Sequence, residues 1–123
     1  MSTTASPSRR ILVVEDQRDS RESLRVLLEL WGYQVECAPD GRLGVEKALS
    51  WRPDVVVLDI GLPGIDGYDV AQRVRTALGG DVLLIAWTGY DSREDHRQTY
   101  DAGFDFHVAK ASDPDILQQL LAR

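Results

Sequence analysis

Five polar side chains suited to phosphoryl or metal chemistry each stand at the end of a short apolar run. They are two adjacent acids, a third acid, a hydroxyl and an ammonium: Glu15, Asp16, Asp59, Thr88 and Lys110. Each has an ordinary explanation taken singly, because Asp16 and Thr88 could cap helices and the other charges could simply end strands. If the runs are parallel strands of one sheet, however, all five side chains meet at a single edge.

The three carboxylates are the strongest indication that this edge holds a cation. Carboxylates that lie close together disfavour one another's ionisation, so a site made of Glu15, Asp16 and Asp59 requires a positive partner. Oxygen donors from carboxylates, a backbone carbonyl and water are the ligands that suit Mg²⁺. The sequence therefore predicts a Mg²⁺ site.

Lys110 is unusual within the composition of this chain. Of the 14 basic residues, only Lys47 and Lys110 are lysines, so arginine is the default cation. A lysine is a compact charge on a flexible stem, whereas arginine presents a wide planar fork. We therefore expect Lys110 to pair with a carboxylate and to follow it if it becomes a phosphoryl group.

The elements that must position these residues alternate between strand and helix patterns. Apolar runs of strand length span 11–14, 33–38, 55–58, 82–87 and 106–109. Between them, apolar residues recur at helical spacing: Leu24, Leu27, Leu28 and Trp31, then Val45, Ala48 and Leu49, then Val70, Val74, Ala77 and Leu78, and last Ile116, Leu117, Leu120 and Leu121. This alternation predicts an α/β fold with a parallel sheet covered on both faces.

Several residues mark the expected helix ends. Gly32 can cap the end of the first helix, Asp66 the start of the third, and Asp113 with Pro114 the start of the last. The fourth helix, about 92–102, is strongly polar, and Tyr100 is its only large apolar anchor. Its polar face is either simply solvated or a mobile, partner-binding surface, and the sequence favours neither.

Composition limits the class of protein. A hydrophobic content of 43% is ordinary for a globular domain, and a net charge of −6 argues against binding nucleic acid directly. Cys37 is the only cysteine, so no internal disulfide is possible. The polar start of the chain lacks the apolar core of a signal peptide, and no run is long enough to cross a membrane. We expect a cytoplasmic protein with a flexible tail at 1–9 and one domain at 10–123.

Six short segments in a fixed order resemble a known family. They are Ile-Leu-Val-Val-Glu-Asp at 11–16, Gly-Tyr-Gln-Val at 32–35, Asp-Gly at 40–41, Asp-Ile-Gly-Leu-Pro-Gly-Ile-Asp-Gly at 59–67, Thr-Gly-Tyr at 88–90, and Ala-Gly-Phe-Asp at 102–105, which leads to Lys110. With them the chain resembles the receiver (response regulator) domain of bacterial two-component systems, and is similar to receivers associated with hybrid histidine kinases. The resemblance implies a flavodoxin-like (βα)5 doubly wound sandwich with strand order 2-1-3-4-5.

The resemblance also implies a function in phosphorelay signalling rather than as an enzyme. Asp59 would take a phosphoryl group from the phosphohistidine of a sensor histidine kinase or a histidine phosphotransfer protein. Mg²⁺, for which Mn²⁺ could substitute, would be held by Asp16, Asp59 and the backbone carbonyl of Gly61, with Glu15 helping through water. Lys110 would neutralise charge on the transferred group.

The same resemblance implies a switch that spreads from the site. Thr88 would donate its hydroxyl to a phosphoryl oxygen and so reshape the surface around the fourth helix, where a downstream protein could bind. His107 stands where the family has an aromatic switch residue. Either it simply fills that position, which we favour, or its protonation biases the switch near neutral pH.

Ala111 departs from the family, which usually has a proline after the lysine with a cis peptide between them. A cis bond before a residue other than proline costs about 3–4 kcal/mol. We therefore expect either a trans bond that displaces Lys110 or a strained cis bond.

Three other functions compete with this interpretation. An aspartyl-phosphate hydrolase needs a second Asp two residues after the first, where this chain has Gly61. A flavin or nucleotide binder needs a phosphate-cradling loop after the first strand, but the acids of residues 15–19 would repel a phosphate. A receiver-like adaptor that binds partners without phosphorylation stays open, because of Ala111.

Overall fold

The fold is a single parallel sheet between two layers of helices. The computed structural model describes residues 9–62 and 64–122, so the expected tail at 1–9 lies almost wholly outside the described residues. The strands are β1 (Arg10–Val14), β2 (Gln34–Ala38), β3 (Val55–Leu58), β4 (Leu83–Thr88) and β5 (Phe106–Ala109). They pair in the order β2-β1-β3-β4-β5, which confirms the predicted order.

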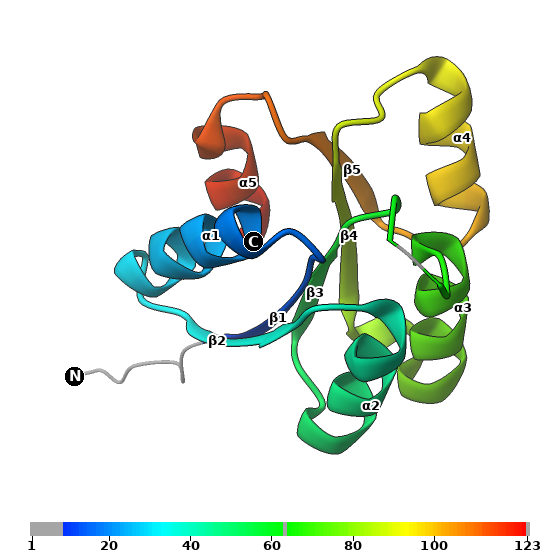
Figure 1. Cartoon of the computed structure of the whole chain (residues 1–123), viewed down its shortest axis with the longest axis horizontal. Coiled ribbons are helices and arrows are strands. Elements are labelled where there is room, and N and C mark those ends of the chain that lie inside the picture. The colour runs from blue at the N-terminus through cyan, green and yellow to red at the C-terminus, as the bar shows by residue number, and fades with distance from the viewer. Residues whose placement is uncertain (1–8, 63, 123) are drawn as a thin grey trace.

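The helices cover both faces of this sheet (Figure 1). Helices α1 (Arg18–Leu30) and α5 (Pro114–Leu121) lie on one side, and α2 (Gly41–Trp51), α3 (Gly67–Leu78) and α4 (Arg93–Asp101) lie on the other. Alternate strand residues face the two layers: Ile11 belongs to the same buried cluster as Leu28 of α1, whereas Leu12 belongs to the cluster that contains Val74 of α3. Every residue of β3 is buried, as expected for a strand covered on both faces.

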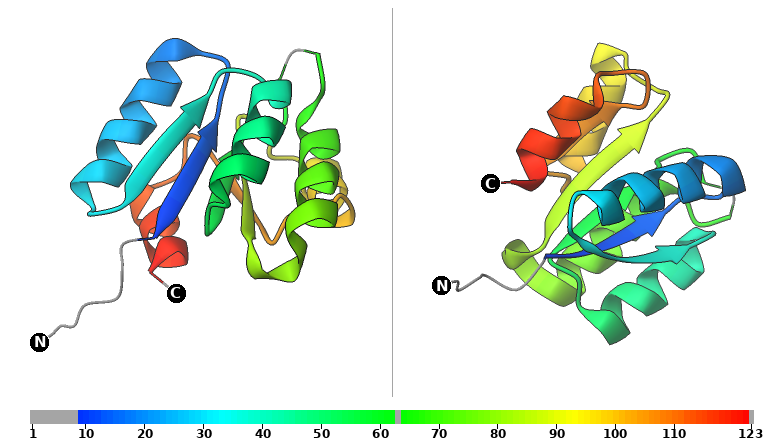
Figure 2. Two further views of the ribbon diagram at one scale, coloured as in Figure 1. Left: turned by 90° about the horizontal axis from the view of Figure 1, so that it is seen from below. Right: turned by 90° about the vertical axis from the view of Figure 1, so that its left-hand side faces the viewer.

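The strand register brings the predicted site residues to one edge. All strands run the same way (Figure 2), so their C-terminal ends lie together. Val14 pairs with Leu58, and the next amide, that of Asp59, donates to the Val14 carbonyl at 3.0 Å. At the far side, the Lys110 amide donates to the Thr88 carbonyl at 2.9 Å. Backbone pairing therefore fixes the position of Asp59 and Lys110 relative to the neighbouring strand ends.

The predicted helix caps are largely confirmed. Asp66 accepts a hydrogen bond from the Asp69 amide, and Asp113 does the same for Asp115 with Pro114 at the first helical position. Gly32 has a φ of 97°, the left-handed backbone that favours glycine after a helix. Asp16 caps nothing, because α1 begins after Gln17 without a side-chain cap. Asp16 is thus available for other chemistry.

The predicted anchor of α4 was wrong. Tyr100 is 53% exposed, and Thr99 is the buried residue of this helix. The Thr99 hydroxyl lies 2.8 Å from the His96 carbonyl and 3.0 Å from Nδ1 of His107, so polar contacts hold the helix to β5. A capping box between Ser92 and Asp95 fixes its start.

Helical spacing also predicted a core position for some residues that in fact lie at the margin of the core. Leu49 and Ile116 are 45% and 46% exposed, and Ala77 is exposed. Each is adjacent to a more buried residue of the same helix: Ala48, Leu117 and Leu78, respectively. None of the described helices is long and apolar enough to cross a membrane.

The close approach of the backbone at Asp59 and Ile60 to residue 67 should require a glycine at that position. A Cβ at Gly67 would lie 2.4 Å from the Ile60 Cα and 2.7 Å from the Asp59 carbonyl oxygen, whereas a Cβ at Gly80 would meet nothing within 4 Å. We expect Gly67→Ala to lower the free energy of unfolding by about 1–3 kcal/mol, and Gly80→Ala to change it by roughly 0.5 kcal/mol or less. Urea denaturation measures both, and equal midpoints would contradict this role.

Candidate functional site

Three carboxylates meet at the C-terminal edge of the sheet, as predicted. One oxygen from each of Glu15, Asp16 and Asp59 lies within 4.8 Å of the others, and we call this group the acidic edge. Glu15 is fully buried, Asp59 is nearly so, and Asp16 is exposed. The set combines two fixed acids with one that solvent reaches, an arrangement that can receive a hydrated cation.

Lys110 provides the positive charge within the protein itself. Its ammonium donates to Oδ2 of Asp59 at 3.1 Å and also makes a close ion pair with Oε1 of Glu15. The ammonium nitrogen lies 4.9 Å from the centre of the Trp87 ring, which adds a cation–π contact. Lys110 therefore joins β5 to β1 and β3 across the edge.

Burial and charge shift the protonation of this pair. Burial raises the pKa of Glu15, although hydrogen bonds from Lys110 and the Gln17 amide act against the shift. For Lys110, burial alone would lower the pKa, but hydrogen bonds to Glu15 and Asp59 and the charges of both acids outweigh it and raise the pKa. The ammonium therefore stays charged at neutral pH.

The Asp59 side chain is held in one orientation with one oxygen on each side. Oδ1 accepts from the Gly61 amide at 3.0 Å, and Oδ2 accepts from Lys110. The Tyr90 ring lies over Gly61, where an added Cβ would come within 2.9 Å of it. The absence of a side chain at Gly61 thus lets the exposed Tyr90 ring lie close to this residue.

Thr88 and His107 are brought together by one residue between them. The Tyr90 amide donates to Oγ1 of the buried Thr88 at 3.2 Å, and the Tyr90 carbonyl lies 2.7 Å from Nε2 of His107. The side chain of His107 is completely covered, and burial lowers its pKa despite the contact with Tyr90. A neutral His107 near pH 7 fits the interpretation that it fills the aromatic position; the predicted pH bias stays a prediction.

The peptide bond after Lys110 resolves the question raised by Ala111. No peptide bond among the described residues is cis, yet Lys110 still reaches both acids. The chain turns directly after the lysine, where the Ser112 amide and hydroxyl both donate to the Ala109 carbonyl, at 3.0 and 2.6 Å. The expected displacement of Lys110 by a trans bond was therefore wrong.

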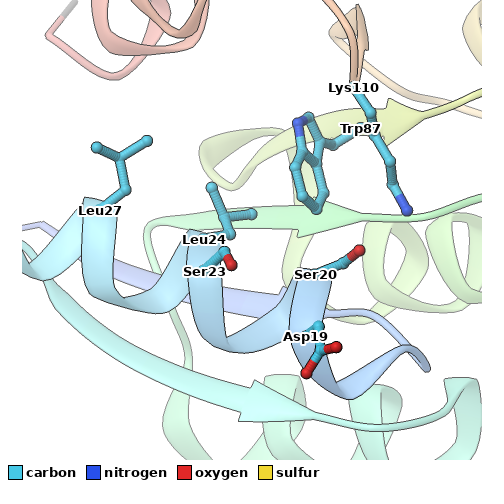
Figure 3. A pocket seen from close by; sticks show the side chains of 7 residues that line it. All are labelled: Asp19, Ser20, Ser23, Leu24, Leu27, Trp87 and Lys110. Atoms are coloured by element: carbon cyan, nitrogen blue, oxygen red, sulfur yellow. The ribbon is translucent and has the colours of Figure 1, made fainter.

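An open pocket begins beside Lys110 and follows α1 (Figure 3). Its lining is mixed, with Trp87 and Leu27 as apolar walls and Ser20 as a polar one. A neighbouring shallow surface continues along the same helix to Val26 and Leu30, which are 47% and 77% exposed. Sequence reasoning missed this surface, because apolar spacing alone does not show which leucines stay uncovered.

Sequence reasoning also missed Asp91 and His96, which lie against His107. Oδ1 of Asp91 is 2.6 Å from Nε2 of His96 and 3.6 Å from Nε2 of His107, and the two imidazole rings are stacked. The only sequence signal was that the chain has two histidines and both follow β4. Their contact depends on the packing of α4 against β5.

Comparison with known proteins identifies the family to which this geometry corresponds. The family model described as the response regulator receiver domain matches residues 11–122. Response regulator MprA of Mycolicibacterium vanbaalenii is 44% identical over 114 residues, which are 93% of this chain and 48% of that protein. The MprA protein of Mycobacterium ulcerans is 43% identical over 93% of this chain. The chain spans about half the length of these curated relatives.

Solved structures show the same fold. The chemotaxis protein CheY4 of Vibrio cholerae aligns with a TM-score of 0.86 at 27% identity, covering 94% of this chain and 98% of that one. The BeF3-activated N-terminal receiver domain of Klebsiella pneumoniae RstA aligns with a TM-score of 0.86 at 27% identity, covering 92% and 95%. The flavodoxin-like expectation is confirmed.

The ion pair between Lys110 and Glu15 should contribute more to the free energy of unfolding than the ion pair of the other lysine, Lys47. Lys110→Ala leaves the buried Glu15 without its cation, which should cost about 1–3 kcal/mol of unfolding free energy. Lys47→Ala is the matched control, because Lys47 pairs with Glu36 where both side chains are at least 40% exposed, and such pairs contribute roughly 0–1 kcal/mol.

Urea denaturation in chelator compares the two variants. Adding Glu15→Gln to Lys110→Ala should recover part of the loss, since the buried carboxylate is then neutral. Equal losses for Lys110→Ala and Lys47→Ala would contradict this account.

Proposed function

We propose, from the premise that this chain belongs to the response regulator receiver family, that Asp59 accepts a phosphoryl group in two-component signalling. The observation that supports this most directly is that each oxygen of the Asp59 carboxylate accepts a hydrogen bond, one from the Gly61 amide and the other from Lys110. A carboxylate oxygen of Asp59 attacks the phosphorus of a phosphohistidine. The phosphorus–nitrogen bond breaks, the released imidazole takes up a proton, and an acyl phosphate remains on Asp59.

The residues around Asp59 prepare it for this transfer. Lys110 already contacts Oδ2, so its ammonium is in place to neutralise charge that grows on the incoming group. The Gly61 amide holds Oδ1 and fixes the carboxylate plane. The Tyr90 ring lies beside Gly61 and is 58% exposed.

The acidic edge fits a hard divalent cation. Its donors are carboxylate oxygens, and the Gly61 carbonyl together with water could complete an oxygen shell for Mg²⁺, or for Mn²⁺ in its place. Asp16 and Asp59 would hold the ion, with Glu15 helping through water. When bound, the ion supplies further neutralisation of phosphoryl charge.

Tyr90 couples the site to the α4 face in this proposal. If the Thr88 hydroxyl turns to a phosphoryl oxygen, its acceptor contact with the Tyr90 amide changes. Tyr90 also contacts His107 through its carbonyl, so the movement reaches β5 and α4. The polar face of α4 is then the surface on which a downstream protein reads the phosphorylated state.

A receiver-like adaptor that is never phosphorylated is the alternative. Its main support was the displacement of Lys110 expected from Ala111, and Lys110 is in contact with Asp59. That alternative now lacks a structural observation in its favour.

Phosphorylation of Asp59 should be visible in the intact mass. Incubation with acetyl phosphate and Mg²⁺ should add one phosphoryl group to the wild type, and none to Asp59→Asn or in the presence of a chelator. Because small donors do not phosphorylate every receiver, a panel of phosphorylated histidine kinases forms the second arm. No mass gain from either arm would favour the unphosphorylated adaptor.

The Thr88 hydroxyl should transmit the switch without being needed for the transfer. Thr88→Ala should still gain the phosphoryl group, but the amide NMR shifts that phosphorylation causes at Tyr90 and His96 should largely vanish. Thr76→Ala, an exposed change on α3, is the control that keeps them. Undiminished shifts in Thr88→Ala would contradict the proposed route.

The donor protein should dock on the exposed apolar surface of α1. This surface leads to the pocket beside Lys110, so a partner bound there could present its phosphohistidine to Asp59. Leu30→Ser should slow transfer from a phosphorylated histidine kinase about tenfold, the equivalent of roughly 1.4 kcal/mol, and leave acetyl phosphate labelling unchanged. Leu49→Ser on α2 is the matched control, since Leu49 is also exposed; an equal effect of both would overturn the assignment.

A further inference from the structure

Both histidines of the chain lie in one cluster at the start of α4, separate from the acidic edge. The cluster consists of Asp91, which precedes α4, His96 in α4 and His107 in β5. One ligand atom from each of the three lies within 4.8 Å of the others. The His96 and His107 rings stack with centroids 3.8 Å apart and planes 17° apart, so their edges face the same carboxylate.

The distances within this cluster suit a small cation. Oδ1 of Asp91 lies 2.6 Å from Nε2 of His96 and 3.6 Å from Nε2 of His107, and the Tyr90 carbonyl oxygen lies 2.7 Å from the latter nitrogen. Zn²⁺ with bonds of about 2.0–2.1 Å holds tetrahedral donors roughly 3.3 Å apart. The observed separations fall on both sides of that value. Because the rings are stacked, their in-plane lone pairs are nearly parallel, so the exposed His96 ring has to rotate out of the stack before both Nε2 atoms can bind one ion.

The hydrogen bonds of His107 require either a proton or a metal ion at Nε2. The Tyr90 carbonyl can only accept, and Nε2 faces it. The Thr99 hydroxyl has one proton, which can go to the His96 carbonyl at 2.8 Å or to Nδ1 of His107 at 3.0 Å. If Thr99 donates to His96, Nδ1 must donate to Thr99, and Nε2 then needs either a second proton or a metal ion.

Two arrangements satisfy these contacts without a second proton on His107. In the first, the neutral ring carries its proton on Nε2 and donates to the Tyr90 carbonyl, while the Thr99 hydroxyl donates to Nδ1 instead of to the His96 carbonyl. In the second, a metal ion at Nε2 lets Nδ1 donate to Thr99 while Thr99 donates to His96, the outer contact that metal-bound histidines usually have.

We propose that Asp91, His96 and His107, with the Tyr90 carbonyl, form a second metal site that takes a divalent transition-metal ion of the Zn²⁺ class. Two imidazoles and one carboxylate favour Zn²⁺, Co²⁺ or Ni²⁺, whereas the all-oxygen acidic edge favours Mg²⁺. The two sites therefore differ in the metal that they select. The second site shares no residue with the acidic edge.

An ion at this site would join three parts of the fold. Asp91 belongs to the segment after β4, His96 to α4 and His107 to β5. This segment begins directly after Thr88, and α4 has Thr99 as its buried residue. Metal binding would thus fix the part of the molecule that lies between the acidic edge and the α4 face.

Titration of the tag-free chain with Co²⁺, followed by its visible absorption, tests the proposal. Excess Mg²⁺ in the buffer occupies the acidic edge, and Asp16→Asn controls for binding there. Cys37→Ser controls for the single thiol. His96→Gln and Asp91→Asn each remove one ligand from a solvent-accessible position, and circular dichroism checks that both variants are folded.

The expected result is one Co²⁺ per chain that Zn²⁺ displaces, in the wild type and in both controls. His96→Gln and Asp91→Asn should each weaken binding roughly 10–100-fold or more. The proposal is overturned if His96→Gln binds as tightly as the wild type, if binding is lost only in Asp16→Asn or Cys37→Ser, or if no saturable binding occurs below about 1 mM.

Discussion

The structure depends on one electrostatic constraint: several carboxylates and a single ammonium share the C-terminal edge of a parallel sheet. Glu15 has no solvent exposure, and Lys110 is the cation that compensates it while also contacting Asp59. A buried carboxylate without such a partner would be costly. The register of β1, β3 and β5 and the turn after Ala109 therefore have to bring residues distant in sequence to within hydrogen-bonding distance.

The residues after β4 connect this edge to the rest of the surface. Tyr90 contacts Thr88 through its amide and His107 through its carbonyl, while its ring lies over Gly61. A single residue thus adjoins the acid at Asp59, the hydroxyl at Thr88 and the histidine cluster. Because α4 is held to β5 through the polar contacts of Thr99 as well as through packing, a change at Tyr90 can reach it without disturbing the apolar core.

The two clusters of possible metal ligands illustrate how donor chemistry separates sites on a small domain. The acidic edge presents only oxygen from side chains, and the cluster of Asp91, His96 and His107 presents two imidazoles with one carboxylate. Hard cations prefer the former, and borderline transition metals prefer the latter. The segment from Thr88 to Asp91 lies between them, so the same backbone borders both.

The sequence by itself determined the fold class, the strand order through the family resemblance, and the membership of the acidic edge. The fold class and the acidic edge depend on local patterns, since an apolar run followed by a polar residue places that residue at the end of a strand. The tertiary structure decided the rest. It showed that Lys110 reaches its acids across a trans bond before Ala111, that Thr99 and not Tyr100 anchors α4, and that His96 stacks on His107. These are contacts between different elements, and sequence spacing within one element does not define the packing between two.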